Sequence, residues 1–265
     1  MTFRRFRILL LLGVLLAALS LTWVEQNMVR GWRAPLDVAV FPINGDGSEA
    51  AADYIRSLQA DRFSDIAAFV ERETARYGVR QTPSMLIAVY PELKKHPPAP
   101  PQGGNALSTI WWSLKLRWWV YRQSGQWMPQ LGKIKLYVLY HAPRDDTPLA
   151  HSLGLQKGLI GVVHAFADPK QTPQNNIVIA HELLHTLGAT DKYDSAGRPV
   201  YPQGYAEPDL PESMPRRDAE IMAGRYIAAN GRLTMPPGLD HCVIGPQTAR
   251  EINLDEGFKR QFSGS

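Results

Sequence analysis

Two histidines and a glutamate in the second half of the chain have the types and the spacing for metal-assisted hydrolysis. His181, Glu182 and His185 form the pattern H-E-x-x-H. Residues four positions apart share a helix face, so both imidazoles can bind one ion, and neutral imidazole is a good zinc ligand. Glu182 would lie beside that ion and accept a proton from the attacking water. The spacing predicts one catalytic Zn²⁺, with Glu182 as the general base.

Two further residues extend the pattern to H-E-x-x-H-x-x-G-x-x-D. Gly188 follows the second histidine, and Asp191 follows the glycine. Glycine readily adopts the left-handed conformation that ends a helix and turns the chain. That turn would bring Asp191 back to the metal as a third ligand and leave a coordination position for water.

The flanking residues predict that the pattern lies on a helix. A bare H-E-x-x-H also occurs by chance in ordinary amphipathic helices and requires this context. Asn175 or Asn176 can cap the start of the helix. Apolar residues then recur at helical spacing and give the helix a side to bury, namely Ile177, Ala180, Leu184 and Leu187.

The extended pattern resembles the zinc signature of the metzincin metallopeptidases. Its aspartate form, followed here by Lys192, Tyr193 and Asp194, is similar to that of immune inhibitor A and snapalysin-like bacterial peptidases. The resemblance implies an α+β zincin domain with a mixed sheet, an active-site helix and an irregular C-terminal subdomain. It also implies a zinc endopeptidase, whose partner is a peptide or protein substrate.

Metzincins also carry a methionine turn beneath the metal. The segment Ala219–Gly224 resembles that turn, and Met222 matches its methionine, with Met214 and Met235 as alternatives. In several metzincins a tyrosine shortly after this methionine contacts the metal or the transition state. Tyr226 is the candidate here, although it follows Met222 at a longer spacing than usual.

Other interpretations of the same residues stay open. Glu212 or Glu220, rather than Asp191, would be the third ligand in a zinc peptidase that takes a glutamate from a later segment. Asp194 is either a hydrogen-bond partner of the ligands or a turn residue. A different class of function is a catalytically idle envelope protein, used for binding or as a scaffold, in which the metal only stabilises the fold.

Composition sets broader limits. The 265 residues suffice for one large domain or two small ones, and 45% hydrophobic with 20% charged residues is ordinary globular composition. The net charge is +4, with scattered lysines and arginines, so we expect no nucleic-acid partner. Cys242 is the single cysteine, so no intramolecular disulfide can form and an exported domain would depend on its core and its metal.

The N-terminus has a membrane-targeting pattern. Arginines at positions 4, 5 and 7 precede an uncharged apolar run from Ile8 to Val24. The length of this run is near the lower limit of ~17–25 residues for a spanning helix. We expect a signal anchor in residues 1–24, and the alternative is a signal peptide cleaved near residue 20. The protein would then face the bacterial periplasm or the cell exterior, anchored in the inner membrane or secreted.

The remaining segments must position the metal ligands. We expect a linker over residues 25–33 and the metallopeptidase domain over 34–265, with an upper subdomain to about 188 and a lower one over 189–265. Periodicity predicts strands at 35–42, 84–90, 133–140 and 159–167, a helix over 48–77 that breaks near residue 60, and another over 106–122. The proline- and glycine-rich segment 197–215 predicts irregular structure, and 244–254 predicts a final helix.

The segment 106–122 is unusually rich in tryptophan. It contains Trp111, Trp112, Trp118 and Trp119, mixed with Lys115, Arg117 and Arg122. One interpretation is contact with a membrane interface, where tryptophan and basic residues are favoured. The other is a thick helix packed on two sides inside the protein.

Overall fold

The computed structural model describes residues 3–79, 82–101, 106–123, 132–143, 152–155 and 159–255. The longer helices are α1 (Phe3–Arg30), α2 (Glu49–Arg56), α3 (Ser64–Arg76), α4 (Ala106–Gln123), α5 (Thr172–Leu187) and α6 (Pro246–Glu251). Short 3-10 turns are η1 (Ala60–Phe63), η2 (Pro169–Gln171) and η3 (Leu239–His241). The strands are β1 (Leu36–Asn44), β2 (Met85–Val89), β3 (Lys133–His141), β4 (Leu153–Leu155), β5 (Ile160–Phe166), β6 (Ala219–Glu220), β7 (Tyr226–Ile227), β8 (Leu233–Thr234) and β9 (Cys242–Val243).

A mixed sheet forms the centre of the protein. Its strand order is β2-β1-β3-β5-β4. The first four strands pair in parallel, and β4 pairs antiparallel with β5 at one edge. The predicted mixed sheet is therefore present. The apolar patterns predicted β1, β2, β3 and β5, whereas β4 is too short to give a clear alternation.

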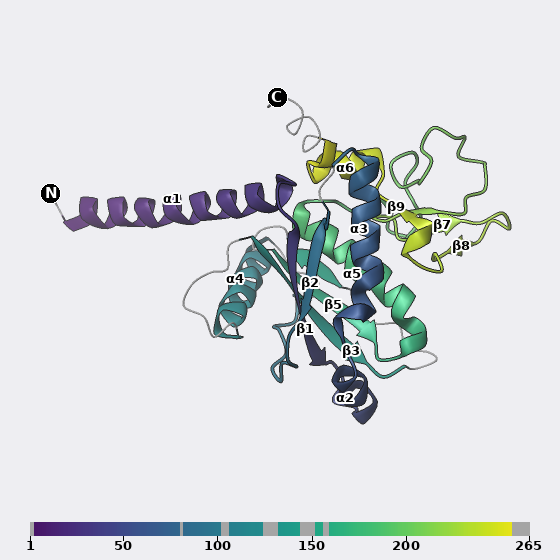
Figure 1. Cartoon of the computed structure of the whole chain (residues 1–265). Helices are drawn as coiled ribbons and strands as arrows, with labels where there is room; N and C mark the ends of the chain where they lie inside the picture. The colour runs from purple at the N-terminus through teal and green to yellow at the C-terminus, as the bar shows by residue number, and fades with distance from the viewer. Residues whose placement is uncertain are drawn as a thin grey trace.

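Helices cover both faces of the sheet (Figure 1). On one face, α3 and α5 bury Phe69 and Ile177 in a cluster that includes Val38 and Leu136 of the sheet. On the other face, α4 buries Leu116 in a cluster with sheet residues. Parallel strands that are covered on both faces contain continuous apolar runs. In β3 this run is residues 136–140, which are all buried.

The Trp-rich helix α4 packs on one side alone. Trp112, Leu116 and Val120 are buried against the sheet. Trp111 and Trp118 lie on the opposite side and are 60% and 61% exposed. The prediction that this helix packs inside the protein on two sides is therefore wrong, because the structure places only one of its two apolar faces on the sheet.

The helix that carries the H-E-x-x-H pattern starts earlier than predicted. It begins at Thr172, with proline in its first turn. The amide of Asn175 instead pairs with the backbone of Phe166, and that of Asn176 donates to the Arg62 carbonyl. The capping role predicted for these asparagines is wrong, because both side chains tie the helix interior to neighbouring elements.

The end of the same helix follows the prediction. Gly188 has φ of 108° and terminates α5 in the left-handed conformation. The Gly188 N–H donates to the His185 carbonyl, and Ala189 N–H donates to the Leu184 carbonyl. Gly188 therefore turns the chain sharply after the second histidine.

The N-terminal helix α1 extends away from the rest of the chain (Figure 1), and it continues through most of the predicted linker. The helix ends at Arg30. Val29 and Trp32 are buried in the core, and the Trp32 indole donates to the Ile252 carbonyl. Residues 25–30 are thus helical rather than irregular, and the end of α1 is anchored to the C-terminal part of the chain.

The structure gives no support to a spanning segment. Among the residues described, none of the helices combines the length and the apolar character needed to cross a bilayer. The signal anchor, and its cleavage as a signal peptide, stay predictions.

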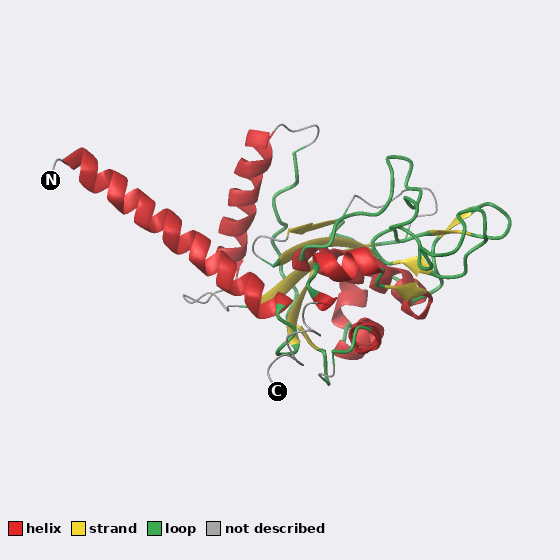
Figure 2. Cartoon of the chain, turned by 90° about the horizontal axis from the view of Figure 1, so that it is seen from above, coloured by secondary structure: helices red, strands yellow, loops and turns green. Residues whose placement is uncertain are grey.

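Beyond α5 the chain is largely irregular, as expected. Loops dominate this region (Figure 2), and two small sheets, β6 with β9 and β7 with β8, connect parts of it. Pro246 begins α6, close to where the final helix was predicted. The division into two subdomains near residue 188 stays a prediction.

Candidate metal centre

The two histidines of α5 are held with one ring nitrogen each facing the same space. The ring centroids of His181 and His185 are 4.6 Å apart, with an interplanar angle of 84°. Nδ1 of His181 lies 3.0 Å from the Ile221 carbonyl, and Nδ1 of His185 lies 2.8 Å from the Ala189 carbonyl. Because a carbonyl only accepts hydrogen bonds, each Nδ1 carries the hydrogen. Each Nε2 is therefore the ring atom that can bind a metal once it carries no proton.

Asp191 lies against both histidines. Its Oδ1 is 3.2 Å from Nε2 of His181 and 3.1 Å from Nε2 of His185. Partial burial acts to raise the pKa of Asp191, but the hydrogen bonds with the two histidines outweigh it and hold that pKa well below its usual range. The turn at Gly188 therefore brings an ionised carboxylate to the two ring nitrogens.

Glu182 is buried beside the histidines, with one oxygen left free. Glu182 is only 5% exposed. Oε2 accepts no hydrogen bond from any residue that the structure describes. Burial raises the pKa of Glu182, and the two neighbouring histidines partly counter this effect. A buried carboxylate oxygen without a partner is costly unless water or a cation satisfies it.

These side chains form a candidate metal-binding group. Ligand atoms of His181, Glu182 and His185 all lie within 4.8 Å of one another. Two imidazole nitrogens with one carboxylate oxygen form a donor set typical of zinc and of several other transition metals. The group fits a divalent cation, and either Glu182 or Asp191 can supply the oxygen.

Residues on both sides of Asp191 are fixed to the C-terminal helix. Nζ of Lys192 donates to both carboxylate oxygens of Glu251, at 3.0 and 2.8 Å, and to the Thr190 carbonyl at 2.7 Å. The N–H of Thr190 donates to Glu251 at 2.9 Å. Lys192 is 4% exposed, so this ion pair is largely shielded from solvent. The clamp sets the backbone of Asp191, and no sequence signal links it to Glu251, far along the chain.

Glutamine at position 251 is expected to destabilise the protein in a pH-dependent manner. Burial acts to raise the pKa of Glu251, but bonds from Lys192 and Thr190 outweigh it and lower that pKa below 4.5. A carboxyl group whose pKa is lower in the folded state stabilises the protein at pH values above its pKa in the unfolded state. This contribution is lost as the pH falls through the pKa of the folded state. We expect Glu251→Gln to lower the unfolding free energy by about 2 kcal/mol at neutral pH.

Urea unfolding from pH 7 down to pH 3 measures this difference, which is expected to shrink below about pH 4.5. Asp209→Asn, at an exposed loop position, serves as the control and is expected to change little at any pH. A deficit that stays constant across the pH range would show that the carboxylate charge is not what stabilises this segment.

The segment predicted to be a methionine turn contacts one of the two histidines. Met222 is fully buried, and the Ile221 carbonyl of the same turn receives the His181 hydrogen bond. Glu220 holds the turn, because its carboxylate accepts bonds from the N–H groups of Met222, Ala223 and Gly245 and from the Thr248 hydroxyl.

The two downstream glutamates proposed as third ligands lie elsewhere. Glu220 is fully buried, and its hydrogen-bond partners are the turn itself, Gly245 and Thr248 of α6. Glu212 lies near Tyr205, whose pKa is raised first by burial and then by that carboxylate. The structure therefore brings Asp191, and neither glutamate, to the histidines.

Two other candidates do not join the centre. Oδ1 of Asp194 accepts from the N–H groups of Ala196 and Arg198, both at 2.9 Å, so Asp194 stabilises a turn. Tyr226 lies in β7, paired with Thr234 of β8. Among the described residues, no recorded contact joins Tyr226 to the histidines.

Tyr193 is a site residue that the sequence argument gave no role. Its ring centroid is 6.3 Å from that of His181. Burial first, then the charges of Asp191 and Glu182, raise the pKa of Tyr193 to about 12. The sequence does contain a signal for this role. Residues two positions apart in an extended segment point the same way, and Tyr193 follows Asp191 at that spacing.

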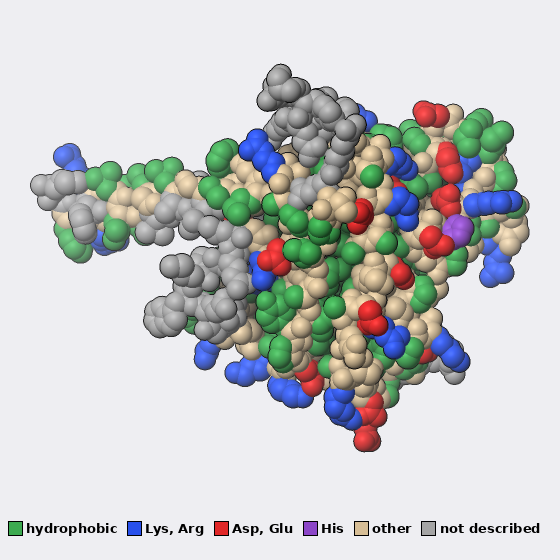
Figure 3. Space-filling view, viewed as in Figure 1, with side chains coloured by type: hydrophobic (Ala, Val, Ile, Leu, Met, Phe, Trp, Pro, Cys, Tyr) green, Lys and Arg blue, Asp and Glu red, His purple; other side chains and the backbone are tan. Residues whose placement is uncertain are grey.

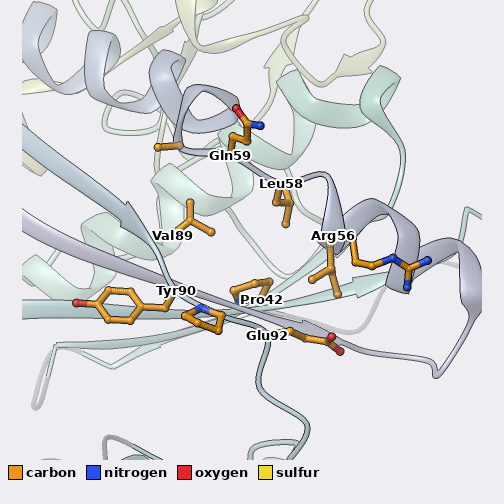
Figure 4. A pocket seen from close by; sticks show the side chains of 10 residues that line it. Pro42, Arg56, Leu58, Gln59, Val89, Tyr90 and Glu92 are labelled. Atoms are coloured by element: carbon orange, nitrogen blue, oxygen red, sulfur yellow. The ribbon is translucent and has the colours of Figure 1, made fainter.

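Two further features lie away from this centre. A cavity of about 480 Å³ is lined by residues of the β1 end, α2 and the segment after β2, including Pro42, Arg56 and Tyr90 (Figure 4). On the α4 side of the sheet, Nε2 of His141 lies 2.9 Å from Nδ1 of His164. Burial, followed by the charge of His141, lowers the pKa of His164 to about 4, so the His164 imidazole is neutral at neutral pH.

No protein-family model matches the chain, and no curated protein matches its sequence. Among solved structures, the chain is similar to the crystal structure of catalytically inactive OgpA from Akkermansia muciniphila in complex with an O-glycopeptide (glycodrosocin) substrate, at 13% identity and a TM-score of 0.38. The match covers 82% of this chain and 59% of the OgpA chain, so the chain spans less than two thirds of that protein's length. A similarity of this size assigns neither a family nor an activity.

Proposed function

We propose that the chain is a zinc-dependent endopeptidase of the metzincin type. The proposal rests mainly on the positions of three potential ligand atoms. Oδ1 of Asp191 lies 3.2 Å from Nε2 of His181 and 3.1 Å from Nε2 of His185. The free carboxylate oxygen of the buried Glu182 beside them is the second support. A hydrolase needs this combination of cation ligands and an adjacent base.

Asp191, rather than Glu182, is the proposed third ligand. Oδ1 of Asp191 contacts Nε2 of both histidines. The bonds of Thr190 and Lys192 to Glu251 fix the backbone on both sides of Asp191. Assigning Asp191 to the metal leaves Glu182 free to handle a proton, and a catalytic zinc site uses three protein ligands with one open position.

The chemistry that follows is the addition of water to a peptide bond. Bound zinc supplies Lewis acidity, which makes a carbonyl easier to attack and a water easier to deprotonate. Glu182 accepts the proton as the water oxygen adds to the carbonyl carbon, and then delivers this proton to the leaving amine nitrogen as the C–N bond breaks. The raised pKa of Glu182 suits this exchange, because the carboxyl must both take and return a proton.

The edge strand β4 is the proposed place for substrate backbone. An added Cβ at Gly154 would lie 2.4 Å from Cβ of His185 and 2.6 Å from the Glu182 carbonyl oxygen. Strand β4 therefore lies directly against the helix that carries the ligands. An extended peptide can add to a sheet edge through main-chain hydrogen bonds, and this edge would place it beside Glu182.

Tyrosine 193 is expected to stabilise the transition state. With its pKa raised to about 12, the hydroxyl stays protonated at neutral pH and can donate to the developing oxyanion. We expect Tyr193→Phe to lower kcat by about 100-fold, the effect of one lost oxyanion donor, with little change in KM. Tyr201→Phe, another partly exposed tyrosine, is the control. Equal losses in both variants, or a loss confined to KM, would contradict this role.

Export is part of the proposal. The arginines before the apolar run of residues 8–24 support it. A fusion of the full chain to a reporter enzyme that is active only outside the cytoplasm tests it, and an inactive reporter would contradict it.

The full chain, incubated with a diverse peptide library with and without a zinc chelator, tests the proposed activity. The expected result is cleavage that the chelator abolishes and added zinc restores. A folded, zinc-loaded chain that cleaves nothing would favour the catalytically idle binding or scaffold protein.

A further inference from the structure

One face of α4 carries large apolar side chains that the fold leaves in solvent. They recur at helical spacing and are 52–75% exposed, namely Leu107, Ile110, Trp111, Leu114, Trp118 and Tyr121. The opposite face already supplies the contacts with the sheet. Soluble proteins rarely expose a contiguous apolar patch of this kind unless it binds a partner or a membrane.

The polar residues on this face indicate the kind of partner. The side chain of Lys115 lies 5.4 Å from the Trp111 ring, and Trp118 stacks with Tyr121 at 5.8 Å. Lys115 and Arg122 are exposed, and α4 contains no acidic residue. Tryptophan and tyrosine beside basic residues suit the headgroup region of a bilayer, whereas lysine is depleted in protein–protein interfaces.

The second half of α1 also exposes large apolar side chains. Both α1 and α4 extend away from the sheet (Figure 2), and hydrophobic side chains run along α1 (Figure 3). Trp23 and Met28 of α1 are 68% and 51% exposed.

We propose that the exposed face of α4, together with Trp23 and Met28 of α1, binds the headgroup region of a membrane containing anionic lipids. The aromatic and aliphatic side chains enter the interface, and the basic side chains contact lipid phosphates. This binding is independent of the metal centre. Because α4 and α5 cover opposite faces of the sheet, it leaves the metal centre on the side away from the lipid.

A fluorescent probe on the full chain tests the depth of α4. An environment-sensitive fluorophore is attached at Trp118→Cys, and the native Cys242 does not compete because it is fully buried. The control is Leu210→Cys, at a residue 42% exposed in the C-terminal loops. With vesicles of phosphatidylcholine and phosphatidylglycerol, we expect a shift to shorter wavelength and quenching by lipid-attached quenchers at position 118, and neither at position 210.

Charge removal tests the role of the basic residues. Lys115→Gln with Arg122→Gln is expected to weaken binding to these anionic vesicles by about fivefold for each charge removed, with little effect on pure phosphatidylcholine vesicles. Lys94→Gln with Lys170→Gln, two exposed lysines elsewhere, is the matched control and is expected to retain wild-type binding.

Three outcomes would overturn the proposal. In the first, the probes at positions 118 and 210 are equally exposed to water when the protein is bound to vesicles. In the second, the probe at 118 becomes buried without vesicles as protein concentration rises, which would make a second copy the occupant. In the third, the control pair weakens vesicle binding as much as the pair on α4.

Discussion

Replacing Glu182 with glutamine is expected to lower the rate of peptide cleavage by ~10²–10⁴-fold, the usual contribution of a general base. Glutamine keeps the size and the hydrogen-bonding oxygen of the side chain but cannot accept the proton from water. Because Glu182 is not one of the proposed metal ligands, the zinc content should remain that of the wild type. Cleavage assays and metal analysis on the same preparation measure both effects.

Glu212→Gln is the matched control for this variant, because its carboxylate lies near Tyr205 rather than at the metal centre. We expect its cleavage rate to equal that of the wild type. A Glu182→Gln protein that loses zinc would instead make Glu182 a ligand. One that keeps both zinc and the wild-type rate would remove it from catalysis altogether.

Replacing Asp191 with alanine is expected to weaken zinc binding by at least about 100-fold, because loss of a ligand costs no less than loss of a ligand's supporting partner. Cleavage should fall with the zinc occupancy. The protein should still fold, since Asp191 is partly exposed and the clamp between Lys192 and Glu251 does not involve its side chain.

Asp194→Ala is the control for that experiment, because it removes a nearby carboxylate that only stabilises a turn. Zinc titration of the metal-free proteins by calorimetry compares the two. Wild-type affinity in Asp191→Ala would contradict the proposed ligand set. A loss in Asp194→Ala equal to that in Asp191→Ala would show that the loop as a whole, and not one ligand, controls binding.

Local sequence was sufficient to predict that His181, His185 and Asp191 come together. The four-residue spacing of His181 and His185 needs only a helix to bring their rings together. The return of Asp191 needs only a left-handed residue after the helix, which Gly188 provides with φ of 108°. Both are effects within a few residues, and pattern analysis captures such effects well.

Contacts between distant segments were beyond sequence analysis. The clamp of Lys192 and Glu251, and the hydrogen bond from Thr248 to the buried Glu220, join segments that only the folded chain brings together. The same applies to Asn175 and Asn176. Asparagine often caps helices, but here the side-chain amides donate to the backbone carbonyls of Phe166 and Arg62.

The Trp-rich helix shows a different limit. An apolar helix face gives the same sequence pattern whether protein or lipid covers it. Periodicity identified two apolar sides of α4, but only the structure shows that Leu116 faces the sheet while Trp118 faces solvent.

The most direct test of the metal centre is anomalous diffraction at the zinc absorption edge, from crystals of the zinc-loaded full chain. The predicted result is one peak bonded to Nε2 of His181, Nε2 of His185 and the carboxylate of Asp191, with Glu182 close by but not bonded. A peak bonded to Glu182 and not to Asp191, or a folded chain without any peak at the two histidines, would contradict the assignment.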